Sequence, residues 1–257
     1  MSWKDLVIDE NVKKILIDFS EFEKTRKVSE LKLSSQDLAG MIDHTLLKPD
    51  ATISEITQLC EEAMQNNFAS VCVNPSYVDT CFNLIKSSNV KVCTVIGFPL
   101  GATTNQSKFL EAQEAIKNGA EELDMVINIG KLKDKDYQFV FDDLKSIADL
   151  SKKHLCTSKV ILETCLLNDE EKVIACLLAK EAGLNFVKTS TGFSKGGATM
   201  HDVALMKFVI GDMLQVKASG GIRSYEDAVA MISAGATRLG ASAGVKIIAG
   251  QKSESSY

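Results

Sequence analysis

Short apolar segments alternate with longer amphipathic segments along most of this chain, and the alternation repeats eight times. The short segments suit buried strands, whereas the longer segments carry apolar residues at helical spacing. Strands that alternate with helices of this length form a parallel sheet. We expect strands at residues 41–45, 69–73, 91–96, 122–127, 159–163, 186–189, 214–217 and 238–240.

A segment with helical periodicity follows each expected strand, and several of these segments end on a recognisable signal. Gly119, Gly183 and Gly235 each stand directly after such a segment, where glycine favours helix termination. Two further helices are expected before the first strand, one over residues 1–29 and one that begins near Ser34. The other helices are expected at residues 52–65, 77–85, 108–118, 136–153, 169–182, 201–210, 225–234 and from 245 onward.

Eight β-then-α units in 257 residues indicate a closed (β/α)8 barrel, a TIM barrel with extra N-terminal helices. An open doubly wound sheet is the alternative, but no G-x-G-x-x-G fingerprint opens the first unit. We expect one domain over residues 1–257, with a helical leader at about 1–40 and a mobile polar tail at about 250–257. The loops after barrel strands form the face where active sites lie.

Composition narrows the range of partners. The net charge of −5 argues against nucleic-acid binding, and no apolar run is long enough to cross a membrane. The acidic start of the chain argues against a transit peptide, and we expect a cytoplasmic protein. The seven cysteines form no C-x-x-C pair and are expected to be reduced, while three histidines without H-x-x-x-H spacing supply a zinc site poorly.

Lys188 is the strongest candidate for a catalytic residue. It ends an expected buried strand, where an isolated ammonium is unfavourable and tends to lose its proton. The neutral amine is the form that attacks a carbonyl group to make a Schiff base. The hydroxyl of Thr191 and the backbone N–H of Gly192 follow closely and could hold substrate oxygens. The alternative is an ordinary surface lysine at a strand end.

A near-copy of this pattern places Lys217 at the end of the next expected strand. Because side chains alternate between the two faces of a strand, we expect both lysines to point into the barrel mouth. Two ammonium groups held close together disfavour the charging of either, so the pKa of one is expected to fall. That effect would make the nucleophile reactive near neutral pH. The alternative is that both lysines only attract anions.

Asp124 lies between apolar residues inside an expected strand, and a buried carboxylate usually has a partner. Its strand and that of Lys188 are both even-numbered, and alternate strands fill a common layer of the barrel. Asp124 is therefore expected to reach Lys188, directly or through water, and to shuttle protons. A purely structural salt bridge is the alternative. Asp43 and Thr45 share inward parity on the first strand and could bind a substrate hydroxyl or orient a lysine.

Glycine-rich loops follow the seventh and eighth expected strands, where barrels commonly build a phosphate site. Gly220 and Gly221 allow backbone N–H groups to approach an anion, and Arg223 could add charge from the rim. Ser242 adds a hydroxyl in the second loop. Together the two loops predict a phosphorylated small-molecule substrate.

These motifs resemble those of the deoxyribose-phosphate aldolase family. The matching segments appear in the same order and lie at residues 42–49, 95–101, 122–130, 187–193 and 216–223. The sequences K-T-S-T-G-F from Lys188 and K-A-S-G-G-I-R from Lys217 are the most specific. The resemblance spans residues 41–242, whereas the leader is longer than the compact members of the family need.

The resemblance implies reversible cleavage of 2-deoxy-D-ribose 5-phosphate to D-glyceraldehyde 3-phosphate and acetaldehyde. It implies that Lys188 forms the Schiff base, that Asp124 transfers protons and that Lys217 tunes Lys188. No metal or organic cofactor is implied. A cytoplasmic enzyme of deoxyribonucleoside breakdown is expected, as a homo-oligomer that is a dimer or a tetramer.

Two other functions remain open on the residues alone. One is a different Schiff-base barrel, such as a transaldolase-like or another phospho-sugar aldolase. The other is a barrel that binds sugar phosphates and has lost catalysis, although Lys188, Lys217 and Asp124 together argue against it.

The last residue, Tyr257, carries a phenol that can donate and accept a proton. Some members of the family end in tyrosine, and the resemblance implies that such a tail folds over the site. Tyr257 is therefore a candidate for protonating the enamine carbon, against the alternative of a tail with no role.

Overall fold

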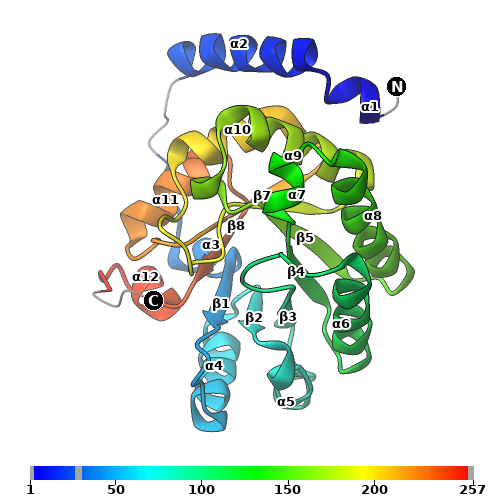
Figure 1. Cartoon of the computed structure of the whole chain (residues 1–257). Coiled ribbons are helices and arrows are strands. Elements are labelled where there is room, and N and C mark those ends of the chain that lie inside the picture. The colour runs from blue at the N-terminus through cyan, green and yellow to red at the C-terminus, as the bar shows by residue number, and fades with distance from the viewer. Residues whose placement is uncertain (1–2, 27–30, 254–257) are drawn as a thin grey trace.

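The chain folds around a closed barrel of parallel strands (Figure 1). A computed structural model describes residues 3–26 and 31–253. Each strand pairs with the next along the chain, and β8 pairs with β1 to close the barrel. This architecture confirms the predicted TIM barrel. The strands are β1 (Ile42–Leu46), β2 (Ser70–Val73), β3 (Lys91–Ile96), β4 (Glu122–Val126), β5 (Thr157–Ile161), β6 (Phe186–Lys188), β7 (Gln215–Ser219) and β8 (Arg238–Ala241).

Helices surround the barrel, and within the described ranges none of them combines the length and the apolar character needed to span a membrane. Those before the first strand are α1 (Trp3–Leu6), α2 (Asp9–Thr25) and α3 (Ser35–Ala39). The others are α4 (Ile53–Asn66), α5 (Val78–Ile85), α6 (Asn105–Lys117), α7 (Ile129–Lys133), α8 (Tyr137–Lys153), α9 (Asp169–Ala182), α10 (Met200–Ile210), α11 (Tyr225–Ala234) and α12 (Gly244–Ile248). Two short 3-10 helices lie at Pro75–Tyr77 and Thr164–Leu166.

The ends of the helices follow from local sequence signals. Thr52 caps α4 in a capping box with Glu55, because each side chain accepts the other's backbone N–H. Asn168 and Glu171 form the same arrangement at the start of α9. That helix ends at Gly183, whose φ of 84° is a left-handed conformation that glycine adopts without a steric penalty.

Several element boundaries differ from the sequence-based prediction, and one helix was not predicted. The fifth strand lies two residues earlier than expected and ends at Ile161, so Glu163 stands beyond it. Helix α6 begins at Asn105, three residues before the expected start, because the Thr104 hydroxyl caps it. Helix α7 was not predicted; the Asn128 side chain accepts the N–H of Lys131 and starts it.

The leader packs against the outside of α9 and α10 (Figure 1). One helix was expected over residues 1–29, but the helical stretch is divided before Asp9, because Ile8 has an extended backbone. Phe19 is buried on α2, and its ring centroid lies 5.5 Å from that of Phe208 on α10. His201 on α10 contacts Glu23 on α2 at 3.1 Å and Asp169 on α9 at 3.0 Å, so it joins the leader to the barrel helices.

Candidate active site

Lys188 is the last residue of β6 and is almost fully buried, with 3% of its surface exposed. Its Nζ donates a hydrogen bond of 2.8 Å to Oδ2 of Asp124. It also lines the pocket at the mouth of the barrel. A primary amine is thus held at one end by a carboxylate and faces a cavity that a small molecule can enter.

Lys217 lies beside Lys188, because the two residues are register partners on β6 and β7. It is fully buried, donates 2.7 Å to the same Asp124 Oδ2 and forms an ion pair with Asp43. Burial alone would lower the pKa of Lys217, but the carboxylates of Asp124 and Asp43 outweigh it and raise that pKa above its usual range. Lys217 is therefore a fixed positive charge, and it is not the lysine whose pKa the sequence argument expected to fall.

Asp124, on β4, is fully buried and sits at the centre of a cluster of ammonium groups. Its Oδ2 accepts from Lys188 and Lys217, and its Oδ1 accepts a bond of 2.8 Å from Lys159. Burial alone would raise the pKa of Asp124, but the three ammonium groups hold it well below its usual range. The carboxylate therefore stays ionised and acts as a hydrogen-bond acceptor.

Lys159 is a member of this cluster that sequence reasoning missed. It is the register partner of Asp124 on β5, it is fully buried, and its Nζ also donates 2.5 Å to Glu122. Asp124 and Glu122, together with Asp43, raise its pKa well above the usual range, although burial opposes this. A lysine at the start of the expected fifth strand was the available signal.

Further charged residues surround the cluster of Asp124 and its three lysines. Arg238 on β8 donates 2.6 Å to Oδ1 of Asp43 and approaches both oxygens of Glu122 at 3.3 Å. Burial alone would raise the pKa of Asp43, but Lys217 and Arg238 lower it. Asp43 is fully buried and contacts Lys217, so its geometry favours orientation of that lysine over contact with a substrate.

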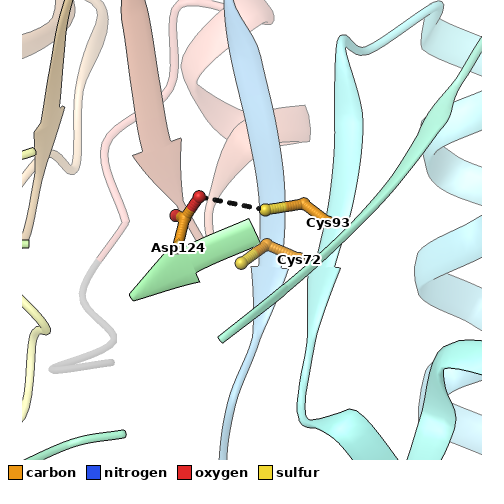
Figure 2. A group of neighbouring side chains, drawn as sticks. All are labelled: Cys72, Cys93 and Asp124. Carbon is orange, nitrogen blue, oxygen red and sulfur yellow. Dashed lines mark hydrogen bonds between the residues drawn. The ribbon is translucent and has the colours of Figure 1, made fainter. Parts of the chain in front are cut away.

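Two cysteines complete the surroundings of Asp124 (Figure 2). Cys72 and Cys93 are register partners on β2 and β3, and the Cys93 thiol donates 3.3 Å to Oδ1 of Asp124. Thiol and carboxylate groups at this spacing can hold a soft metal ion. Here, however, both carboxylate oxygens already accept from lysines, whose positive charge opposes a cation.

The mouth of the barrel is a pocket that brings the predicted binding residues together. The turn after β7 is possible because Gly220 and Gly221 adopt φ values of 85° and 80°, which other residues rarely adopt. Thr45 on β1 also reaches the pocket, and its hydroxyl donates 2.8 Å to the Asp43 backbone carbonyl. The lining includes Thr45, Lys188, Thr191, Gly192, Gly220, Gly221, Arg223 and Ser242.

Two exposed polar side chains line the rim of this pocket. Arg223 and Ser242 are exposed, so both can meet an anion at the rim. Ser253, the last described residue, lies here, since its backbone N–H donates 2.9 Å to the carbonyl of Arg223. Ser253 is buried there. Tyr257 lies outside the described residues.

Comparison with known proteins adds an independent line of support. A family model described as "DeoC/LacD family aldolase" matches residues 38–250. The chain is 58% identical over 225 residues to the deoxyribose-phosphate aldolase of Clostridium perfringens (strain 13 / Type A), covering 88% of this chain and 100% of that protein. It is 59% identical over 224 residues to the deoxyribose-phosphate aldolase of Halalkalibacterium halodurans, covering 87% and 100%.

The fold of the chain is also similar to that of a solved aldolase structure. The chain resembles the "unique tetrameric structure of deoxyribose phosphate aldolase from Aeropyrum pernix" with a TM-score of 0.79 and 34% identity. The match covers 92% of this chain and 96% of that one. The family match begins after α2, and it includes all eight strands and the charged cluster that they carry.

Proposed function

Because the chain belongs to the DeoC/LacD family of aldolases, we infer that it is a class I deoxyribose-phosphate aldolase, a lyase. The reaction is the reversible cleavage of 2-deoxy-D-ribose 5-phosphate to D-glyceraldehyde 3-phosphate and acetaldehyde. The observation that carries this proposal is the Lys188 amine, which contacts Asp124 at 2.8 Å and opens onto a pocket lined by two glycine-rich loops.

Lys188 is the proposed nucleophile. Its neutral amine attacks the C1 aldehyde of the open-chain sugar and, after loss of water, forms an iminium that withdraws electrons. Asp124 is the proposed base, which takes the proton from the C3 hydroxyl through a water, and the bond between C2 and C3 then breaks. Glyceraldehyde 3-phosphate leaves, the acetaldehyde enamine is protonated at carbon, and hydrolysis frees Lys188.

Asp124 is the proposed proton-transfer group, and Lys217 is proposed to tune Lys188. Asp124 accepts hydrogen bonds from both lysines through one oxygen, so it is placed to exchange a proton with the Lys188 amine beside the charge of Lys217. The low pKa of Asp124 means that this carboxylate relays protons and does not store them. Asp124 and Asp43 hold the charge of Lys217 in place beside the nucleophile.

The phosphate is proposed to bind where Gly220, Gly221, Arg223 and Ser242 line the pocket. Ser242→Asp places a carboxylate beside the anion, so KM for the phosphorylated sugar should rise by about tenfold or more. The unphosphorylated sugar should be affected far less. Steady-state kinetics with both sugars checks this, and equal changes in the two KM values would place the phosphate elsewhere.

Tyr257 is proposed to help protonate the enamine carbon. The support is the position of Ser253, which anchors the chain beside the pocket through Arg223. Tyr257→Phe should slow the exchange of acetaldehyde methyl protons with solvent deuterium, while imine formation at Lys188 persists. Exchange at the wild-type rate, followed by NMR, would remove Tyr257 from the mechanism.

The setting and assembly of the enzyme are also proposals. We expect one cytoplasmic domain with a helical leader, and a homo-oligomer. The tail was expected to be mobile from about residue 250, but Ser253 is buried and hydrogen-bonded, and residues 254–257 lie outside the described residues. The similarity to a chain described as tetrameric supports a dimer or a tetramer. Light scattering of the purified protein tests this, and a monomer at micromolar concentration would contradict it.

The proposed activity is tested by the choice of substrate. Purified protein should release acetaldehyde from 2-deoxy-D-ribose 5-phosphate, and cleavage of D-ribose 5-phosphate should be much weaker. Preferential cleavage of the ribose compound would favour another phospho-sugar aldolase. Binding of sugar phosphates without cleavage of either would favour a barrel that has lost catalysis.

A further inference from the structure

We propose that Glu163 is a positioning residue that fixes the direction of the Thr191 hydroxyl in the pocket, so that Thr191 accepts a hydrogen bond from a hydroxyl of the substrate. This inference rests on the proposed aldolase function and extends it to recognition of the sugar. Glu163 does not line the pocket and acts through Thr191, which does.

The backbone at Glu163 is unusual for its residue type. Glu163 follows β5 in a left-handed conformation, with φ 57° and ψ 61°. Residues other than glycine rarely adopt this conformation, and those that do cluster at functional sites. The segment is tied to the neighbouring strand, because the N–H of Thr164 donates 3.0 Å to the carbonyl of Thr189. This conformation carries the Glu163 side chain inward, where only 3% of the residue is exposed.

The Glu163 carboxylate contacts Thr191 through both of its oxygens. It accepts the Thr191 hydroxyl at Oε2 and the Thr191 backbone N–H at 3.4 Å from each oxygen. The Cys165 thiol lies farther away, at 3.9 Å. Within residues 31–253 its hydrogen-bond partners are thus neutral donors. Burial of a carboxylate without a neighbouring cation is unfavourable unless hydrogen bonds satisfy its oxygens.

The consequence concerns the hydroxyl of Thr191, which has one hydrogen to donate and two lone pairs to accept. The hydrogen goes to Glu163. One lone pair accepts the backbone N–H of Phe193 at 3.0 Å. The remaining lone pair is available in the pocket, so Thr191 can accept a hydrogen bond there and cannot donate one. Such a site selects a group that donates, and the hydroxyls of an open-chain sugar do so.

The test combines two substitutions with a substrate that lacks a hydroxyl. Glu163→Gln nearly preserves shape, but its amide can donate to the Thr191 oxygen and release the Thr191 hydrogen. Thr191→Val removes the hydroxyl, Thr191→Ser keeps it, and Cys165→Ala is a matched control beside Glu163. Each variant is assayed for cleavage of 2-deoxy-D-ribose 5-phosphate. Each is also assayed for borohydride trapping of acetaldehyde, which carries no hydroxyl.

We expect Glu163→Gln and Thr191→Val each to lower kcat/KM for cleavage by about tenfold, the effect of one hydrogen bond. The double variant should be no worse than Thr191→Val alone, because both changes remove one interaction. Thr191→Ser should lose less activity than Thr191→Val, and Cys165→Ala should stay within about twofold of wild type. Trapping of acetaldehyde should proceed at the wild-type rate throughout.

Three outcomes would overturn the proposal. If the losses in the double variant multiply, Glu163 does not act through Thr191. If trapping falls together with cleavage, Glu163 only supports the fold. If the wild type is active and the kinetics of Glu163→Gln are unchanged, the proposal for Glu163 is wrong, but the aldolase function stands. A wild type that cleaves no deoxyribose phosphate overturns the proposed function itself.

Discussion

Lys188→Ala should reduce the cleavage of 2-deoxy-D-ribose 5-phosphate by about 10⁴-fold or more, because only a primary amine can form the imine. The variant should remain folded. Asp124 keeps its contacts with Lys159 and Lys217, so no buried carboxylate loses all of its partners. The measurement is acetaldehyde release at saturating substrate, with circular dichroism as the test of folding.

Lys195→Ala is a suitable control for this experiment, because Lys195 is an exposed lysine in the loop after β6 and does not line the pocket. Its activity should stay within about twofold of wild type, as for most surface substitutions. Activity in Lys188→Ala above about one per cent of wild type would show that another group is the nucleophile.

Lys217→Leu should lower kcat by about 10²- to 10⁴-fold, the usual range for a group that assists proton transfer. It removes the fixed charge beside the nucleophile and one of the two amines that share Asp124 Oδ2. Steady-state measurement of acetaldehyde release checks this, and a kcat within about twofold of wild type would remove Lys217 from the mechanism.

This substitution also weakens the fold, so stability must be separated from chemistry. Asp43 keeps its 2.6 Å contact with Arg238 but loses Lys217. Breaking a buried ion pair in this way destabilises a protein by about 3–5 kcal/mol. Lys108→Met is the matched control, since Lys108 is equally buried and pairs with Asp143 away from the barrel mouth. Well below both unfolding midpoints, Lys108→Met should retain activity and Lys217→Leu should not.

The barrel and much of its charged cluster follow from simple periodicity. Side chains alternate along a strand, and this rule directed Asp43, Lys188 and Lys217 to the interior. Asp124 was added because alternate strands fill a common layer of the barrel. The structure joins all four through Asp124 Oδ2 and the ion pair between Lys217 and Asp43. Strand ends that carry glycine and hydroxyl residues also led to the loops around the pocket, because the barrel gathers those ends on one face.

Other parts of the site depend on register, which a single sequence does not supply. Lys159 contacts Asp124 because the two residues pair across β4 and β5. That pairing is fixed by the tilt of the closed barrel and has no signature in local sequence. Glu163 was expected inside the fifth strand, but the strand ends at Ile161 and the chain turns into a left-handed conformation. No residue type there signals that turn, since glutamate seldom adopts it.

The identity of the nucleophile is the central claim, and trapping of the covalent intermediate tests it most directly. The enzyme is incubated with acetaldehyde, reduced with borohydride, digested, and analysed by tandem mass spectrometry. The account predicts the addition of one ethyl group on Lys188 and its loss in Lys188→Ala. The absence of an adduct in wild type, or an adduct on Lys217, Lys159 or another lysine, would contradict it.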